Sequence, residues 1–364
     1  MNAGGKKSIE HSQLQEHFKM KKISIFPRYN TLGASSRYRF YMYAERLVKA
    51  GYEVRISSFL DNDYLTRLYS NRRVNPFMIL RSYIRRLYKA LFSAKCILLE
   101  YEMFPYLPFF FSKLFLAGKK YILNFDDNVW TKYSGKPWLK GKYDRLIKNA
   151  AGVIAANEYL YEIIKKHNGN IIRIPTVIDL DLYQAEYPKF ERFTIIWIGT
   201  PVTYTYVLQF AGAFRQMAGE LDFELLILSS TALEKDRIPG VNMRFVDWHP
   251  AIEAEYLIRS HIGVMPLTDD DFSRGKSAFK IIQYLAAGLP VIASPVGENR
   301  NVIADGENGF LADSPDEWAD VLRKLYRDHE LYSKVAAAAR KSSSEYSIQK
   351  YFPVFLDFME KTFS

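Results

Sequence analysis

Positive side chains stand at the start of two predicted helices, where negative ones are normal. Lys280 falls in the first turn of a helix expected to begin at Ser277, and Arg274 and Lys276 come just before it. Arg37 holds the equivalent place in the first half of the chain. A helix N-terminus carries partial positive charge, so a cation there is favourable when an anion is bound; otherwise such long side chains reach into water. Two clusters in equivalent places predict a diphosphate held across a cleft between two domains.

Loops beside these helices supply further groups that could hold an anion. Gly33 and Ala34 precede the Arg37 helix, for which Ser35 or Ser36 is the expected N-cap. A second loop follows an apolar strand and would add backbone N–H groups and hydroxyls from Gly199, Thr200, Pro201 and Thr203. Neither loop has GxGxxG spacing, and the chain lacks GxxxxGK(S/T). A nicotinamide-dependent dehydrogenase and a P-loop ATPase therefore lose support.

Acidic residues end two predicted strands in the first half of the chain. Asp126 and Asp127 follow one strand, and Glu100 and Glu102 lie at the end of the strand before it. A carboxylate beyond a buried strand can orient an acceptor hydroxyl or take its proton. The aspartates could equally cap the next helix, and the glutamates could equally be solvated surface groups. Because consecutive side chains point apart, we expect only one aspartate to face the cleft, and we favour Asp127.

Twelve short apolar runs separated by helical patterns predict the elements that position these residues. Apolar strands alternating with helices are typical of parallel sheets covered on both faces. The first six are expected at Lys22–Phe26, Tyr52–Ile56, Lys95–Glu100, Lys119–Phe125, Gly152–Ala156 and Ile171–Ile174. The other six are expected at Thr194–Ile198, Phe223–Leu228, Met243–Val246, Ile262–Met265, Pro290–Ala293 and Gly309–Leu311. The prediction is an α/β protein with two Rossmann-like doubly wound sheets, in which ligands bind beyond the carboxyl ends of the strands.

The same pattern divides the 364 residues into four parts. Residues 1–20 form a polar N-terminal arm without the apolar core of a signal peptide. Residues 21–185 and 190–340 form the two domains, and residues 341–364 a last helix that could cross back to the first domain. The apolar run 104–117 is too short to span a membrane. Cys96 is the single cysteine, which excludes an internal disulfide and a multi-cysteine metal site, and we expect no metal site elsewhere.

Charge is distributed unevenly along the chain. The net charge is +10, but residues 1–180 carry +17 and residues 181–364 carry −7. One basic half indicates a face that meets an anionic surface, and a uniformly basic nucleic-acid binder would not split this way. In the predicted helix 80–92, one face is apolar and the opposite face is basic, with Arg81, Arg85, Arg86 and Lys89. We expect these four to contact an anionic bilayer, although a core helix with a solvated face gives the same split and RNA is a weaker alternative.

The chain resembles the retaining GT-B glycosyltransferases of the family-4 type, the glycosyl transferases group 1. The resemblance covers nearly the whole chain and is densest from residue 262 to residue 309. The run from Phe279 to Ser294 looks like that family's donor-binding helix and the strand that follows it. The family usually has two glutamates eight positions apart here, whereas this chain has Gly275 and Gln283. It resembles a subgroup with FKxxQY in place of the paired-glutamate motif.

The resemblance implies roles for individual residues. Lys280 matches a lysine that contacts the leaving diphosphate, while Arg274 and Lys276 would supply charge that the family carries after the first strand of its second domain. Trp248 matches the base-contacting loop, with a core aromatic as the alternative. Asp127 would serve the acceptor, and Asp126, Glu100, Gly33, Ala34 and Arg37 would face the acceptor or the diphosphate. Donor contacts are expected from Ser277, Ala278, Phe279 and Gln283, the last through hydrogen bonds to the ribose, together with Gly199, Thr200, Pro201 and Thr203.

The expected function is retaining transfer of a sugar from a nucleotide-diphosphate donor, UDP- or GDP-linked, to a glycan or lipid-linked acceptor. No cofactor, metal or nucleic acid is expected, and the enzyme would work in the cytoplasm on the inner face of the membrane. A sugar-nucleotide epimerase with the same layout is one alternative. A catalytically inactive nucleotide-sugar-binding module is the other, because both glutamate positions of the family motif are altered.

Overall fold

Two parallel six-stranded sheets form the molecule, as the sequence predicts. This computed structural model describes residues 21–70 and 72–364, so the predicted N-terminal arm lies outside the described residues. The first sheet has the order β2-β1-β3-β4-β5-β6 and the second β12-β11-β10-β7-β8-β9. Every strand pair is parallel, and each strand end lies within one residue of its expected position. The α/β prediction with two Rossmann-like domains is confirmed.

The first domain contains the strands β1 (Lys22–Phe26), β2 (Glu53–Ile56), β3 (Cys96–Glu100), β4 (Lys120–Phe125), β5 (Gly152–Ala155) and β6 (Ile171–Arg173). Its helical segments are α2 (Ala34–Ser36), η1 (Arg37–Tyr41), α3 (Met42–Lys49), α4 (Asn62–Tyr69), α5 (Pro76–Leu91), α6 (Phe109–Leu116), η2 (Val129–Tyr133), η3 (Pro137–Leu139), α7 (Lys142–Lys148) and α8 (Glu158–Lys165). The short helix η4 (Leu180–Tyr183) lies in the connection to the second domain and packs on that domain's core.

The second domain contains the strands β7 (Phe193–Ile198), β8 (Phe223–Ser229), β9 (Met243–Asp247), β10 (Ile262–Met265), β11 (Val291–Ala293) and β12 (Gly309–Leu311). Its helical segments are η5 (Pro201–Thr203), α9 (Thr205–Gln209), α10 (Ala211–Ala218), η6 (Thr231–Asp236), α11 (Pro250–Arg259), α12 (Asp271–Arg274), α13 (Phe279–Ala286), α14 (Asn299–Val302), α15 (Pro315–Arg327), α16 (His329–Ser342) and η7 (Ser343–Tyr346). The last helix is α17 (Ile348–Phe363).

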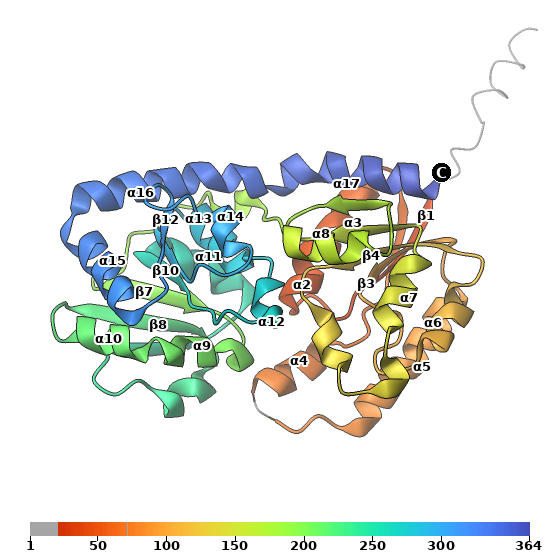
Figure 1. Cartoon of the computed structure of the whole chain (residues 1–364), viewed down its shortest axis with the longest axis horizontal. Coiled ribbons are helices and arrows are strands. Elements are labelled where there is room, and N and C mark those ends of the chain that lie inside the picture. The colour runs from red at the N-terminus through yellow and green to blue at the C-terminus, as the bar shows by residue number, and fades with distance from the viewer. Residues whose placement is uncertain (1–20, 71) are drawn as a thin grey trace, which may run out of the picture.

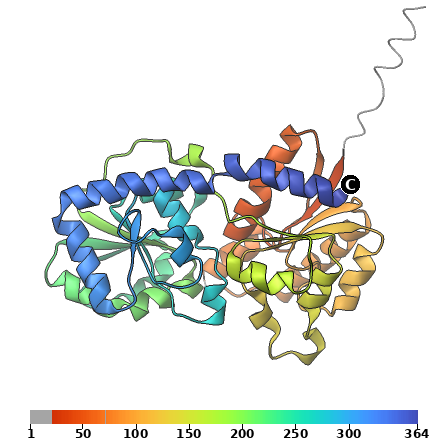
Figure 2. The same ribbon diagram turned by 45° about the horizontal axis from the view of Figure 1, so that its top comes forward.

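The last helix returns to the first domain. Helices α16 and α17 lie end to end along one side of both domains (Figures 1 and 2). Phe355, Phe358 and Met359 of α17 pack in one core cluster with Ile23 of β1 and Ile122 of β4. The aromatic side chains of α17 therefore complete one face of the first sheet, where they are removed from water.

The chain crosses between the domains twice, and the two crossings are bonded to each other. The first crossing lies between β6 and β7, and the second between α16 and α17. Ile178 in the first donates its N–H to Tyr346 O at 2.9 Å, and Ile348 N–H in the second donates to Ile178 O at 2.9 Å. These bonds tie both connections together at one point between the domains.

Helix α5 is rotated with respect to the sequence prediction. Arg86, expected on a membrane-facing surface, is 1% exposed and donates to Pro27 O at 2.6 Å, and its guanidinium lies over the Phe26 ring. Burial lowers the pKa of Arg86 to about 9. Arg85 is half-buried and donates to Ser58 O and Phe59 O. The prediction is therefore wrong for Arg85 and Arg86, because this side of α5 packs on the domain; Arg81 and Lys89 are exposed.

Within residues 21–70 and 72–364, no helix has both the length and the apolar character required to cross a bilayer.

The docking of α17 gives a stability prediction. Phe355→Ala should lower the free energy of unfolding by about 3–5 kcal/mol, because the buried ring leaves a cavity in the core. Val354→Ala, at the neighbouring exposed position, should change it by less than about 0.5 kcal/mol. Chemical denaturation of both variants measures the difference, and equal losses would contradict this packing.

Candidate active site between the two domains

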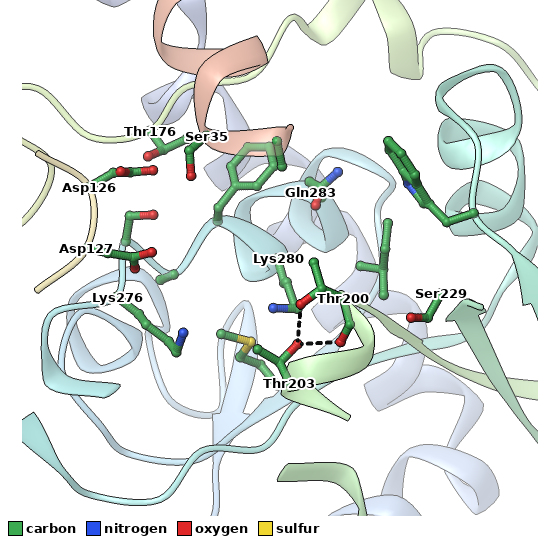
Figure 3. A pocket seen from close by; sticks show the side chains of 18 of the residues that line it. Ser35, Asp126, Asp127, Thr176, Thr200, Thr203, Ser229, Lys276, Lys280 and Gln283 are labelled. Atoms are coloured by element: carbon green, nitrogen blue, oxygen red, sulfur yellow. Dashed lines mark hydrogen bonds between the residues drawn. The ribbon is translucent and has the colours of Figure 1, made fainter. Parts of the chain in front are cut away.

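A cavity of about 240 Å³ lies between the two domains, beyond the carboxyl ends of the strands. Figure 3 shows Ser35, Asp126, Asp127 and Thr176 of the first domain around the same space as residues of the second. The second domain contributes the loop after β7, the helix α13 and the residues just before it. Its lining residues include Gly199, Thr200, Pro201, Thr203, Ser229, Trp248, Glu253, Lys276, Ser277, Ala278, Phe279, Lys280 and Gln283. The expected donor segments thus come together in one place, with Ala34 on the opposite side.

The start of α13 directs two lysines into this cavity. The helix begins at Phe279 with Ala278 as N-cap, so the expected N-cap at Ser277 is wrong by one residue. Ala278 adopts the left-handed region at φ 52°, which costs a non-glycine residue about 1–2 kcal/mol. Lys276 lies before this turn and Lys280 after it, and both side chains line the cavity (Figure 3). Backbone strain is held here at a ligand-sized space, as is common at functional sites.

The backbone of Gly199 leaves room for Lys280. A Cβ at Gly199 would lie 3.0 Å from Lys280 Cε and 2.5 Å from the Trp197 ring. The close approach explains why a glycine follows β7 and shows that the two donor segments are in direct contact.

Burial and mutual charge shift the pKa values of the facing groups. Burial and, to a smaller extent, the neighbouring charge of Lys276 lower the pKa of Lys280 to about 7, whereas the charge of Asp127 opposes the shift. Burial raises the pKa of Asp127 to about 6, with Asp126 acting in the same direction and both lysines against it. Titratable groups in a cleft whose surroundings move their pKa values toward pH 7 are candidates for catalysis.

Both aspartates line the cavity, which corrects the expectation that only one would. Asp126 is 4% exposed and accepts a hydrogen bond from the Tyr101 hydroxyl. Asp127 accepts no such bond among the described residues, which leaves its carboxylate available on the side of Lys276 and Lys280. Asp127 is therefore the better placed of the two to meet a ligand.

Arg37 does not line the cavity, so the prediction that it contacts a diphosphate there is wrong. Its guanidinium pairs with Glu253 of α11 at 3.2 Å, and the Tyr38 hydroxyl donates to the same carboxylate at 2.6 Å. From the second domain, the indole N–H of Trp248 donates to Glu253 at 2.7 Å and the amide of Gln283 at 2.8 Å. We call these five residues the Glu253 clamp. It joins side chains of both domains at one buried carboxylate.

The clamp also uses hydrogen-bond donors of Gln283 and Trp248, which are expected to contact the sugar donor. Both residues line the cavity as expected, but each donates a side-chain N–H to Glu253. Gln283 retains its amide oxygen for a ligand hydroxyl. Glu253 itself was missed, because a single glutamate in an amphipathic helix carries no sequence signal that distinguishes it from surface charge.

Arg274 does not line the cavity. It pairs with Asp269, which precedes α12, at 2.7 Å and with Asp271 of α12 at 3.6 Å, so its predicted contact with the diphosphate is wrong. The oppositely charged neighbours in sequence satisfy it locally.

Asn128 of the first domain fills the space where a side chain at residue 275 would lie. A Cβ there would lie 2.5 Å from Asn128 Cβ and 2.8 Å from Asn128 N. Asn128 also donates to Asp271 O at 3.0 Å, and Asn157 donates to the carbonyls of Gly275 and Lys276 at 2.9 and 3.0 Å. These two asparagines, which the sequence analysis missed, hold the loop that carries Lys276. A glutamate at residue 275 would not fit this contact.

Three remaining candidates lie outside the cavity. Glu100 is buried and accepts bonds from Arg28 N–H and the Ser36 hydroxyl, both at 2.6 Å. Ser36 precedes η1, but its side chain makes no capping hydrogen bond there. Burial and the charge of Asp126 raise the pKa of Glu100 to about 7. Glu102 is 4% exposed and pairs with Lys132 and Lys142 rather than being solvated. Gly33 packs on Tyr29 and is the N-cap of α2.

Across the described ranges 21–70 and 72–364, no group of three or more His, Cys, Asp or Glu side chains is arranged to hold a metal ion.

Comparison with known proteins gives matches for both the second domain and the whole fold. Residues 192–328 match the family model described as "Glycosyl transferases group 1". A D-inositol 3-phosphate glycosyltransferase of Paenarthrobacter aurescens is 24% identical over 244 residues, which is 58% of each chain. The namesake from Xylanimonas cellulosilytica is 29% identical over 140 residues, 37% of this chain and 30% of its own length. The chain thus spans little more than half the length of the first of these relatives.

Solved structures share the architecture over both domains. A glycosyltransferase of Rickettsia africae superposes with a TM-score of 0.68 at 14% identity, covering 95% of this chain and 99% of its own. HepE of Anabaena, in complex with UDP-glucose, gives a TM-score of 0.70 at 13% identity over 93% of this chain and 99% of its own. The chain has the GT-B fold.

Lys280 gives a prediction of stability against pH. The folded protein carries the charged Lys280 only below pH about 7, whereas the unfolded chain carries it up to its ordinary value, so burial of this ammonium costs stability at and below neutrality. Lys280→Met should raise the melting temperature, most at about pH 6 and least at about pH 10. Lys235→Met, at an exposed lysine of the same domain, is the control. A destabilised Lys280→Met at about pH 6 would contradict the assigned burial.

Proposed function

We propose that the chain is a member of the glycosyl transferases group 1 and transfers a sugar from a nucleotide-diphosphate donor to an acceptor hydroxyl. The observation that carries the proposal is the meeting of Lys276 and Lys280 with Asp127 in one interdomain cavity. The match of residues 192–328 to that family and the fold shared with HepE in complex with UDP-glucose support it.

The lysines would act on the leaving group. As the bond from the sugar to the diphosphate breaks, negative charge grows on the diphosphate oxygens. Lys276 and Lys280, placed around the start of α13, stabilise that charge electrostatically. Two ammonium groups here would serve without a metal ion, and burial makes Lys280 more sensitive to an incoming anion.

Asp127 would act on the acceptor. Its carboxylate lies on the first-domain side, opposite the loop 199–203. It would accept a hydrogen bond from the acceptor hydroxyl and orient it toward the donor sugar. The transfer is proposed to retain the configuration of the sugar, with a UDP- or GDP-linked donor and a glycan or lipid-linked acceptor.

Two assays separate this function from its alternatives. A thermal-shift screen with UDP-, GDP-, ADP- and TDP-sugars identifies the donor, because a ligand of the folded form raises the melting temperature. Nucleotide release that depends on an added acceptor supports transfer. An isomerised nucleotide sugar without acceptor would indicate an epimerase, and binding without any turnover would indicate an inactive module.

The donor assignment predicts the effect of one substitution. Lys280→Met should lower kcat/KM for the donor more than tenfold, a loss above about 1.4 kcal/mol, because the leaving diphosphate loses a cation that lines the cavity. Lys235→Met should retain the activity of the parent enzyme. Initial rates of nucleotide release measure both, and near-normal rates for Lys280→Met would refute the assignment.

The facing pKa values predict a bell-shaped pH profile. Activity requires Asp127 to be ionised and Lys280 to be charged, so log kcat/KM should rise up to about pH 6 and fall above about pH 7. Asp127→Asn should remove the acid limb, and Lys280→Met the alkaline limb. The two groups interact, so the limbs belong to the pair. A profile that stays flat between about pH 5 and 9 would contradict both roles.

A further inference from the structure

The outward surface of α5 and α6 is apolar, although these helices belong to a folded domain. Nine of the eighteen exposed large apolar side chains in the described part of the chain come from these helices or the residue after α5, each 39–76% exposed. In α5 they recur at helical spacing on one side. They are Phe77, Leu80, Ile84, Tyr88, Leu91 and Phe92, with Phe110, Phe111 and Leu114 of α6. We call these nine residues the docking face.

The inner side of α5 shows that this orientation is not a default packing outcome. The helix buries Ser82, Arg86 and Ala90, and leaves Leu80 and Ile84 at 55% and 59% exposure. Burying a guanidinium costs free energy, whereas burying each exposed aliphatic side chain would gain about 1.5–3 kcal/mol. An orientation that forgoes this gain is explained when the apolar side has another environment to enter.

The two helices that carry the docking face are neighbours. α5 and α6 pack against each other, and Figure 1 shows them side by side at the outer edge of the first domain. Aromatic rings extend the surface, with Tyr88 and Phe92 centred 4.9 Å apart. A gathering of exposed apolar side chains on two neighbouring helices marks an interaction site.

The charges on α5, on α6 and in the segment just before α5 have one sign. Arg72, Arg73, Arg81, Lys89 and Lys113 are exposed, and no acidic residue occurs from position 64 to position 99. The nearest acids in sequence are Asp63, which is exposed and paired with Arg67, on one side and Glu100, 2% exposed, on the other. Cations around an apolar surface complement anionic lipid headgroups. They oppose pairing with a second copy of this chain, which would bring the same positive charges together.

We propose that the docking face inserts into the interfacial region of an anionic bilayer, with α5 and α6 lying along the membrane surface and the surrounding cations on the headgroups. The apolar side of α5 contacts the acyl chains, whereas Arg86 stays inside the domain. The inference names the membrane partner of the proposed transferase but stands without its catalysis, because its test contains no sugar donor.

The test is flotation of the full chain with vesicles. Parent protein should float with vesicles of phosphatidylcholine and phosphatidylglycerol in equal parts and much less with phosphatidylcholine alone. Leu80→Gln/Ile84→Gln/Leu91→Gln should weaken the partition coefficient at least tenfold. The matched control Val48→Gln/Leu182→Gln/Val354→Gln removes three exposed apolar side chains from other surfaces and should bind as the parent does. Melting temperatures of both triple variants confirm that the fold is kept.

The contribution of charge has a separate variant. Arg81→Gln/Lys89→Gln should weaken binding to anionic vesicles and reduce its dependence on salt, while leaving the weak binding to phosphatidylcholine unchanged. Parent protein that fails to float at low salt, or an α5 triple variant that floats as well as its control, would overturn the proposal. Dimers in sedimentation velocity that the α5 triple variant abolishes would overturn it in favour of a second copy.

Discussion

One buried carboxylate, that of Glu253, joins the two domains. Arg37 and Tyr38 reach it from the first domain, and Trp248 and Gln283 from the second. A buried charge is tolerable only when hydrogen bonds and an opposite charge compensate it, so all five side chains must hold their places together. Because Gln283 and Trp248 also line the cavity, this contact between the domains contributes to the shape of the site, together with the contacts of Asn128 and Asn157.

The environment of the site favours the uncharged forms of its own ionisable groups. Burial and the charge of Lys276 lower the pKa of Lys280, and burial and the charge of Asp126 raise the pKa of Asp127. Each group is therefore less stable alone than beside an opposite charge. An arriving diphosphate relieves the lysines, and an arriving hydroxyl gives Asp127 a donor, so the empty cavity is arranged around charges that a ligand completes.

The sequence allowed most of the fold to be predicted, because most strands are short apolar runs that are buried and bounded by polar turns. Lys276, Lys280 and Asp127 were also within reach, since a cation at a helix start and an acid after a strand are local signals. Most of the errors share one cause. Arg37 and Arg86 are satisfied by partners that only the tertiary structure brings near, and Glu253, Asn128 and Asn157 act across the domain boundary. Periodicity within one segment contains no information on such contacts. Arg274 differs, because its partners Asp269 and Asp271 are near it in sequence.

The paired crossings between the domains limit how the cleft can open. Ile178 is bonded to Tyr346 and Ile348, so both connections pass through a single point beside the base of α17. Two free linkers would let the domains slide and twist in any direction. Two connections that are bonded together act as a hinge. The movement that remains is a rotation about this hinge, which would separate Asp127 from Lys280 and bring them together again.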